Sequence, residues 1–388
     1  MAWLTDIDRR LIGLTWLVKL GVLLVGAIAY VSFRHGVIDS PADILQMWSR
    51  WDAPHYLDLV VFGYRDGDSS GLVGPHGYRS VYPEDLALYI VFYPLFPWLA
   101  TLVNVVVDNP LVSAFVVTTV ASMFVAPLLY RLVRHDQEAS VALRAAWFTL
   151  IFPTAYFLHI GYTEALFMAL VLGSFLAART DRWWLAGALG GLAALTRING
   201  LVLIPALGAE ALTQWLQRPP AERRLRVEWL AIGLVGIGFG IYLALNYVVY
   251  GTPFEFLHVQ DTHWHKSLAP PWDAVSGAFG WFRSDKPDYR LMYGFMELLF
   301  VGVCLVGTIF AAVRFRPSWF IWMAGNTLLF VSTSFLLSTP RYALTLFPLF
   351  VSLALFSART WMLVLVSAVS LAGLVYFAGR FTTGVWAF

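Results

Sequence analysis

Residues 11–33, with the sequence LIGLTWLVKLGVLLVGAIAYVSF, decide the class of fold. A transmembrane helix needs about 20 consecutive, mainly apolar residues, and this run meets that length. The composition agrees, because 59% of the 388 residues are hydrophobic and only 13% are charged, which is about half of the roughly 25% usual in soluble domains. The sequence therefore predicts an all-α fold, a polytopic membrane protein with a single domain over residues 1–388.

Further apolar runs predict ten more spans, at residues 110–133, 140–160, 164–178, 183–197, 200–216, 228–250, 291–313, 318–337, 341–357 and 360–379. Cytoplasmic loops are enriched in Lys and Arg. The short loops on the side of Arg9 and Arg10 carry Arg131, Arg134, Arg179, Arg182, Arg218, Arg223, Arg224, Arg226, Arg314, Arg316 and Arg359. We therefore expect eleven transmembrane helices, with the N-terminus inside and the C-terminus outside.

Residues 86–107 are apolar, but they are not counted as a span. Pro94 and Pro97 argue against a regular helix here, and a crossing would place every later basic loop opposite Arg9 and Arg10. We expect a re-entrant or interfacial segment, which is tolerated only where it packs on protein or lines a cavity.

The chemically rich segments then share the outer face. They are the first external loop at residues 34–109, the second at 251–290, and the shorter segments 159–164, 196–200 and 338–342. A transporter needs access from both sides, and its polar groups usually lie near the midplane of the membrane. Interior polar candidates are sparse, namely Asn246, Glu297 and Asn326.

The segment Ser49-Arg50-Trp51-Asp52-Ala53-Pro54-His55-Tyr56 holds the central acidic residue, Asp52. A short helical pattern follows it, so Asp52 could be an N-cap that accepts backbone N–H groups. A carboxylate at the membrane surface could equally be a general base, if an acceptor hydroxyl comes within about 3 Å of it. Both interpretations stay open from the residues alone.

Arg197 and Arg341 each lie at the outer end of a predicted span, with no carboxylate beside them in the sequence. An unpaired arginine at membrane depth needs an anion, and guanidinium groups match phosphate well. We expect a phosphate clamp, with arginines that extend to the lipid headgroups as the structural alternative.

Residues 258–266 contain further candidates. Gln260, Trp264 and Lys266 are expected to contact a sugar or a phosphate, while solvated loop residues are the alternative. His263 and His265 could bind a divalent metal, but their spacing is loose and nothing requires a metal.

Several other acidic residues have structural explanations. Glu164 begins a predicted span, where the helix dipole stabilises an acid, and a role in the site is left open. Asp66 and Asp68 lie in a glycine- and serine-rich turn, and Glu84 and Asp85 are weak candidates.

Several of these segments together resemble the PIG-V mannosyltransferases, which add the second mannose of glycosylphosphatidylinositol anchors, and especially their shorter prokaryotic relatives. In order, they are residues 50–56 with Gly63-Tyr64, then 92–97, 162–167, 196–200, 260–264 and 340–342. The resemblance implies a GT-C fold, a polyprenyl-phosphate sugar donor, inversion at the anomeric carbon and no metal. It also implies that Asp52 is the acidic residue of the first external loop, with Arg197 and Arg341 near the donor phosphate.

We therefore expect an inverting glycosyltransferase, with Asp52 as the base, that moves a sugar, expected to be mannose, to a lipid, glycan or protein hydroxyl. Arg197, Arg341 and Lys266 would bind the donor phosphate, and the substrate-binding residues would be Arg50, Trp51, His55, Tyr56, Glu164, Gln260 and Trp264. Membrane lipids are expected partners and nucleic acid is not, because the net charge is only +2 and no basic cluster stands out.

We expect the site to face outward from a prokaryotic cytoplasmic membrane, or into the lumen if the membrane is the endoplasmic reticulum. A transporter or flippase for a lipid-linked glycan is the competing function. An inactive assembly subunit is a third, which would keep the fold but lack Asp52 or the arginines.

Overall fold

The chain is built from helices in this computed structural model, which describes residues 4–67, 71–80 and 86–388. Pairing between extended segments in these ranges is limited to one isolated bridge, between Leu268 and Thr333. Five helical segments are long and apolar enough to cross a membrane: α1 (Asp6–Arg34), α5 (Pro110–Val133), η6 with α10 (Val227–Tyr250), α13 to α14 (Pro287–Arg314) and α18 (Thr360–Thr382). The all-α, integral membrane class predicted from the sequence is confirmed.

Shorter helices fill the space between these five. They are α6 (Ala139–Ile151), α7 (Glu164–Arg179), α8 (Trp183–Ala194), α9 (Leu203–Gln217), α15 (Pro317–Val331) and α17 (Phe347–Phe356). α7 packs between α5 and α8, and most of its side chains are buried. The span expected over residues 341–357 is divided into α16 (Thr339–Ala343) and α17, with Pro348 at the start of the second helix. The count of eleven spans stays a prediction, because these helices are shorter than the roughly 20 residues of a full crossing.

The segment at residues 86–107 is interrupted, as its prolines predict. The 3₁₀-helix η2 (Leu86–Val91) ends before Pro94, and α4 (Leu95–Val107) begins directly after it. The backbone near the break is bonded to protein, because Leu95 N donates to the Leu195 carbonyl at 3.1 Å and the Tyr242 hydroxyl donates to the Ile90 carbonyl at 2.6 Å. Non-helical backbone at membrane depth is tolerated under this condition.

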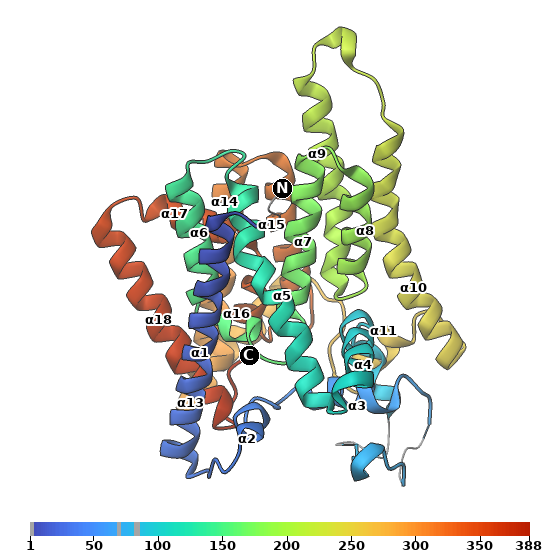
Figure 1. Ribbon diagram of the computed structural model, residues 1–388, viewed down its shortest axis with the longest axis vertical. Coiled ribbons are helices and arrows are strands. Elements are labelled where there is room, and N and C mark those ends of the chain that lie inside the picture. Colours follow the sequence, from blue (N-terminus) through green and yellow to red (C-terminus); the bar gives the residue numbers. More distant parts are fainter. Residues whose placement is uncertain (1–3, 68–70, 81–85) are drawn as a thin grey trace.

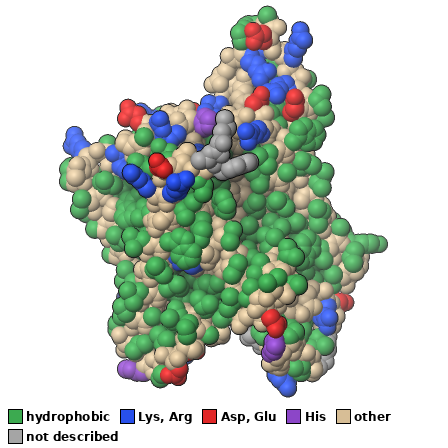
Figure 2. All heavy atoms as spheres, viewed as in Figure 1, with side chains coloured by type: hydrophobic (Ala, Val, Ile, Leu, Met, Phe, Trp, Pro, Cys, Tyr) green, Lys and Arg blue, Asp and Glu red, His purple; other side chains and the backbone are tan. Residues whose placement is uncertain are grey.

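The two ends of the molecule differ in charge. The start of α1 and the loop between α9 and α10 lie at one end, and α2 (Pro41–Gln46) and α3 (Ala53–Phe62) lie at the other (Figure 1). Figure 2 shows Lys and Arg side chains gathered at the first end, above a broad hydrophobic zone. At this end Glu210 of α9 is buried and accepts hydrogen bonds from Arg316 at 2.8 Å and from Ser318 at 2.7 Å. These bonds join α9 to the start of α15.

The loop between α9 and α10 holds the 3₁₀-helix η5 (Pro220–Glu222), and the opposite end carries the other short elements. They are η1 (Pro75–Gly77), α11 (Glu255–Thr262), α12 (Pro271–Phe282) and the π-helix η7 (Arg290–Met296), with the 3₁₀-helices η3 (Ala155–Leu158) and η4 (Ile198–Val202) between the longer helices. Asp58 of α3 is buried and accepts hydrogen bonds from the hydroxyls of Tyr78, Ser80 and Tyr89. The carboxylate thereby ties the first loop to α3.

Candidate active site

Asp52 lies at the N-cap position of α3, but its carboxylate makes no capping bond to the helix. The preceding residue, Trp51, has the left-handed backbone angle φ 53°, which is uncommon outside glycine. Tyr162 holds this turn from both sides: its hydroxyl donates to the Arg50 carbonyl at 2.6 Å and accepts from Asp52 N at 3.2 Å. The carboxylate is therefore free to bind a group outside its own helix.

That group is Arg341, which projects from α16. Its Nη1 donates to Asp52 Oδ2 at 2.6 Å and its Nε donates to Glu164 Oε1 at 2.5 Å. The guanidinium carbon also lies 4.7 Å from the ring centres of both Phe157 and Tyr162. Arg341 thus has a fixed orientation between two carboxylates and two aromatic faces.

Glu164 joins the second arginine to the first. It is fully buried at the start of α7 and accepts a hydrogen bond from Arg197 Nη1 at 2.5 Å. The same nitrogen donates to the Thr163 hydroxyl at 2.9 Å. The premise that Arg197 and Arg341 lack a carboxylate was wrong, because Glu164 lies 33 and 177 residues away from them in the sequence but contacts both.

A second buried carboxylate orients α16. Glu297 of α14 accepts from Ser338 N at 2.7 Å and from Thr339 N at 2.9 Å, the backbone groups that begin this helix. Ser338 also has a left-handed φ of 69°. Glu297 is therefore occupied by a helix terminus rather than placed along a transport path. The side chains of Asn246 and Asn326 likewise donate to backbone carbonyls of their own helices.

A cavity of about 470 Å³ lies beside the Asp52–Arg341 pair. Its polar lining includes Asp52, Tyr56, Arg197, Gln260, Lys266 and Arg341. Rings of Phe92, Tyr93, Phe256, Phe330 and Tyr342 form much of its wall. The Asp52 side chain keeps 30% of its exposure, whereas Arg341 keeps 7% and Glu164 none. The base candidate therefore faces the open part of the cavity, and the groups that hold it lie behind.

Lys266 differs from the two arginines. Its ammonium lies 5.6 Å from the ring centre of Phe335 and 5.7 Å from that of Tyr342. Within residues 4–67, 71–80 and 86–388 it forms no ion pair with a carboxylate. Its charge acts on the buried carboxyl of Glu297 from beyond ion-pair distance, so Lys266 is the cationic group of this cavity that a ligand can bind without breaking a salt bridge.

The electrostatics of Asp52 follow from these contacts. Burial alone would raise the pKa of the Asp52 carboxyl, but the charge and hydrogen bond of Arg341, with the nearby charges of His55 and Arg197, hold that pKa below its ordinary value. Burial raises the pKa of the Tyr162 phenol far above its usual range, so its hydroxyl keeps the proton that it donates to Arg50.

Four other predicted contact residues lie around the cavity rather than on its lining. His55 packs against Tyr89 and Phe92, with ring centres 5.0 and 5.1 Å away. Trp264 packs against His55 at 5.6 Å, and Trp51 meets Trp386 edge-on at 4.9 Å. Arg50 donates weakly to the Met47 carbonyl at 3.4 Å.

Among the remaining candidates that the structure describes, His263, His265 and Asp66 do not line this cavity. His263 and His265 are exposed, and no cluster of three metal-binding side chains is found in the described parts of the chain. Asp66 is exposed. Asp68, Glu84 and Asp85 lie outside the described residues.

Comparisons with known proteins agree with the motifs. Residues 93–244 match the family model described as dolichyl-phosphate-mannose-protein mannosyltransferase. The chain is 28% identical over 227 residues to the mouse GPI alpha-1,6-mannosyltransferase 2, an alignment that covers 53% of this chain and 41% of the relative. The Chinese hamster protein of the same name is 31% identical, over 40% of this chain and 30% of the relative. The matched part thus spans less than half the length of these relatives.

Solved structures of membrane glycosyltransferases show a weak likeness. ArnT from Cupriavidus metallidurans, bound to undecaprenyl phosphate, aligns with a TM-score of 0.49 and 17% identity over 89% of this chain and 61% of its own. The Archaeoglobus fulgidus oligosaccharyltransferase aligns with a TM-score of 0.47 and 12% identity over 95% and 56%. Both likenesses are too weak to place a residue or a ligand in this chain. The family model and the curated relatives confirm the resemblance that the motifs indicated: over the matched part, this chain is similar to the PIG-V mannosyltransferases.

Proposed function

We propose that this protein is an inverting membrane glycosyltransferase that moves a sugar, mannose by its relatives' names, from a polyprenyl-phosphate donor to a hydroxyl acceptor. The observation that carries the proposal is the convergence of Asp52, Arg197, Arg341 and Lys266 on one cavity. A hydroxyl acceptor needs a base, and a phosphate leaving group needs cations. This cavity supplies both, with Arg341 hydrogen-bonded to Asp52 and with Arg197 and Lys266 on the same lining.

The charges of the cavity support a monophosphate donor. Arg197 and Arg341 pair with two carboxylates, Asp52 and Glu164, so among these groups and Lys266, which lines the same cavity, one positive charge is left over. A polyprenyl-phosphate sugar is a phosphodiester with one negative charge. After transfer, Asp52 holds the acceptor's proton, and the cavity then has two positive charges for the more negative phosphate monoester. The positive charge of the site therefore rises by one as the phosphate gains one negative charge.

The chemical step is a single displacement at the anomeric carbon. The acceptor oxygen attacks as the bond to the phosphate oxygen breaks, and Asp52 takes the acceptor's proton. Arg341 makes Asp52 a weak base, so proton transfer occurs late, when the attacking oxygen has gained positive character. Cations placed in advance around the leaving phosphate typically contribute a few kcal/mol each, which removes the need for an acid or a metal.

The arrangement in the membrane is part of the proposal. With the arginine-rich end in the cytoplasm, the cavity lies towards the outer leaflet and eleven segments cross or enter the bilayer. The lipid tail of the donor would then remain in the membrane, between helices, while its phosphate reaches Lys266. The acceptor can be a lipid, a glycan or a protein.

Transfer by the purified protein tests this function. A panel of labelled polyprenyl-phosphate sugars is incubated with the protein and a membrane lipid extract as acceptor, and donor binding is measured separately. Asp52→Asn keeps an oxygen that can accept the Arg341 hydrogen bond, so it should bind donor normally and lose transfer. Transfer that survives in Asp52→Asn refutes Asp52 as the base. A wild-type protein that binds no donor in the panel refutes the proposed activity.

A further inference from the structure

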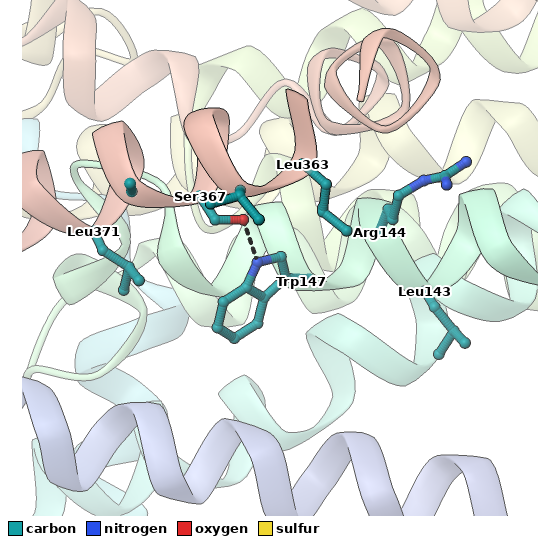
Figure 3. Close-up of a pocket in the computed structure, with 8 residues that line it drawn as sticks. Leu143, Arg144, Trp147, Leu363, Ser367 and Leu371 are labelled. Carbon is teal, nitrogen blue, oxygen red and sulfur yellow. Dashed lines mark hydrogen bonds between the residues drawn. The ribbon is translucent and has the colours of Figure 1, made fainter. Parts of the chain in front are cut away.

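A second cavity, of about 560 Å³, lies between α6 and α18, away from the residues of the candidate active site. Figure 3 shows the side chains of Leu143, Trp147, Leu363 and Leu371 around it, with Arg144 at one end. The volume is within the range of roughly 300–1,000 Å³ that is usual for ligand sites. Apart from Arg144, the residues that line it carry no charge.

The polar groups of this groove leave one donor without an acceptor. The Trp147 indole N–H donates to the Ser367 hydroxyl at 2.9 Å (Figure 3), so this N–H already has its acceptor within the protein. The Arg144 Nε is buried and has no acceptor among the residues that the structure describes. A buried donor costs free energy unless a partner is supplied, and an anion would supply it here.

The direction of the groove matches one leaflet of a bilayer. α6 and α18 both begin at the arginine-rich end of the molecule (Figure 1). Arg144 lies in the second turn of α6 and Leu363 in the first turn of α18, while Leu371 lies deeper. At about 1.5 Å per residue, Leu363 and Leu371 are roughly 12 Å apart along the helix, close to half of the ~30 Å hydrocarbon core.

From these observations we propose that the groove binds an anionic phospholipid from the leaflet at the arginine-rich end. Its phosphate accepts hydrogen bonds from Arg144, and one acyl chain lies along the apolar lining towards Leu371. A polyprenyl chain is a poorer occupant, because the groove ends near the middle of the bilayer. The bound chain would fill the gap between α6 and α18.

Bound lipid can be counted directly. Wild-type protein in detergent is titrated with phosphatidylglycerol or phosphatidylcholine, and native mass spectrometry gives the affinity for each. Losing a charge-assisted hydrogen bond in Arg144→Gln should weaken phosphatidylglycerol binding by about tenfold or more. Phosphatidylcholine has the same phosphate but a cationic choline beside it, so its binding should weaken less. Ala368→Phe should weaken both, because the new ring fills the groove that Ala368 lines.

Arg10→Gln is the matched control. Arg10 is exposed at the same end of the molecule, and its substitution removes the same positive charge. Equal loss of phosphatidylglycerol binding in Arg10→Gln and Arg144→Gln would overturn the proposal, because general charge would then explain it. Undiminished binding in both Arg144→Gln and Ala368→Phe would overturn it too. Neither result depends on transferase activity.

Discussion

Replacing Tyr162 with phenylalanine removes one oxygen atom and leaves the aromatic ring against Arg341. The lost hydroxyl donates to the Arg50 carbonyl at 2.6 Å and accepts from Asp52 N at 3.2 Å. A buried polar group left without a partner costs about 1–3 kcal/mol, so with two such groups the turn before α3 loses roughly 2–6 kcal/mol of local stabilisation. The left-handed backbone of Trp51 then loses the hydrogen bonds that stabilise it, and the Asp52 carboxylate moves away from its position at the cavity.

The kinetic consequence is specific. Since about 1.4 kcal/mol corresponds to a tenfold change in rate, we expect kcat for sugar transfer to fall by about 10- to 100-fold in Tyr162→Phe. The KM for the donor should change little, because Lys266 and the arginine pairs remain. The measurement is transfer kinetics with purified protein and labelled donor, beside the melting temperature of each variant.

Tyr156→Phe is a matched control, because the Tyr156 hydroxyl is equally buried but donates to the Ala387 carbonyl rather than to the Asp52 turn. It should keep kcat within about threefold, because the carbonyl that loses its donor, at a cost of about 1–3 kcal/mol, belongs to Ala387 and lies outside the Asp52 turn. Adding Trp51→Gly should reduce the penalty of Tyr162→Phe, because glycine adopts positive φ without strain. A kcat for Tyr162→Phe within twofold of wild type would refute the positioning role, as would equal losses in both tyrosine variants.

Three further outcomes are expected. Lys266→Gln should raise the donor KM by about tenfold or more with a smaller change in kcat, because an ammonium without a carboxylate partner has its charge available for the phosphate; titration of polyprenyl phosphate binding checks this. The acid limb of kcat/KM should lie below the ordinary Asp pKa of about 3.9, because Arg341 lowers the pKa of Asp52. The carboxylate therefore persists as the pH falls, its contribution to stability is lost only through the lowered pKa, and Arg341→Gln should move the limb to higher pH in a pH–rate profile. Glu297→Ala should lower the melting temperature, with a loss of about 1–3 kcal/mol and reduced kcat, because α16 loses both acceptors at its N-terminus; unchanged values would contradict this.

The long helices could be predicted closely from the sequence. Residues 110–133 were expected as one span and form α5 with those bounds, and residues 360–379 agree with α18. Uninterrupted apolar runs of this length have few alternatives in a membrane. Helix bounds were harder to predict in the apolar runs with internal Pro and Gly, because a break in the helix depends on hydrogen-bond partners from other parts of the chain. The break before Pro348 was missed for this reason, while the break at Pro94 was indicated by two prolines close together.

The main residues of the site could be predicted from the sequence, but the hydrogen bonds and ion pairs between them could not. The shared outer face was enough to bring Asp52, Arg197 and Arg341 together as candidates. Their link through Glu164 was missed, because nothing in the sequence shows which distant side chain reaches a given arginine. Tyr162 was quoted only as part of a motif, and its hydroxyl matters because of a single backbone angle at Trp51 that no pattern reveals.

The internal pairing of the arginines has a physical consequence for how the site stays organised. An arginine buried without an anion is costly in a bilayer, so a phosphate clamp made only of unpaired arginines would collapse or fill with water between turnovers. Glu164 removes this cost and fixes both guanidinium groups in place. The donor then finds both guanidinium groups already oriented, and Lys266, which has no salt bridge to break, can bind the phosphate directly. Glu164 and Asp52 thus keep the cavity shaped for an anion while leaving it only one net positive charge to offer.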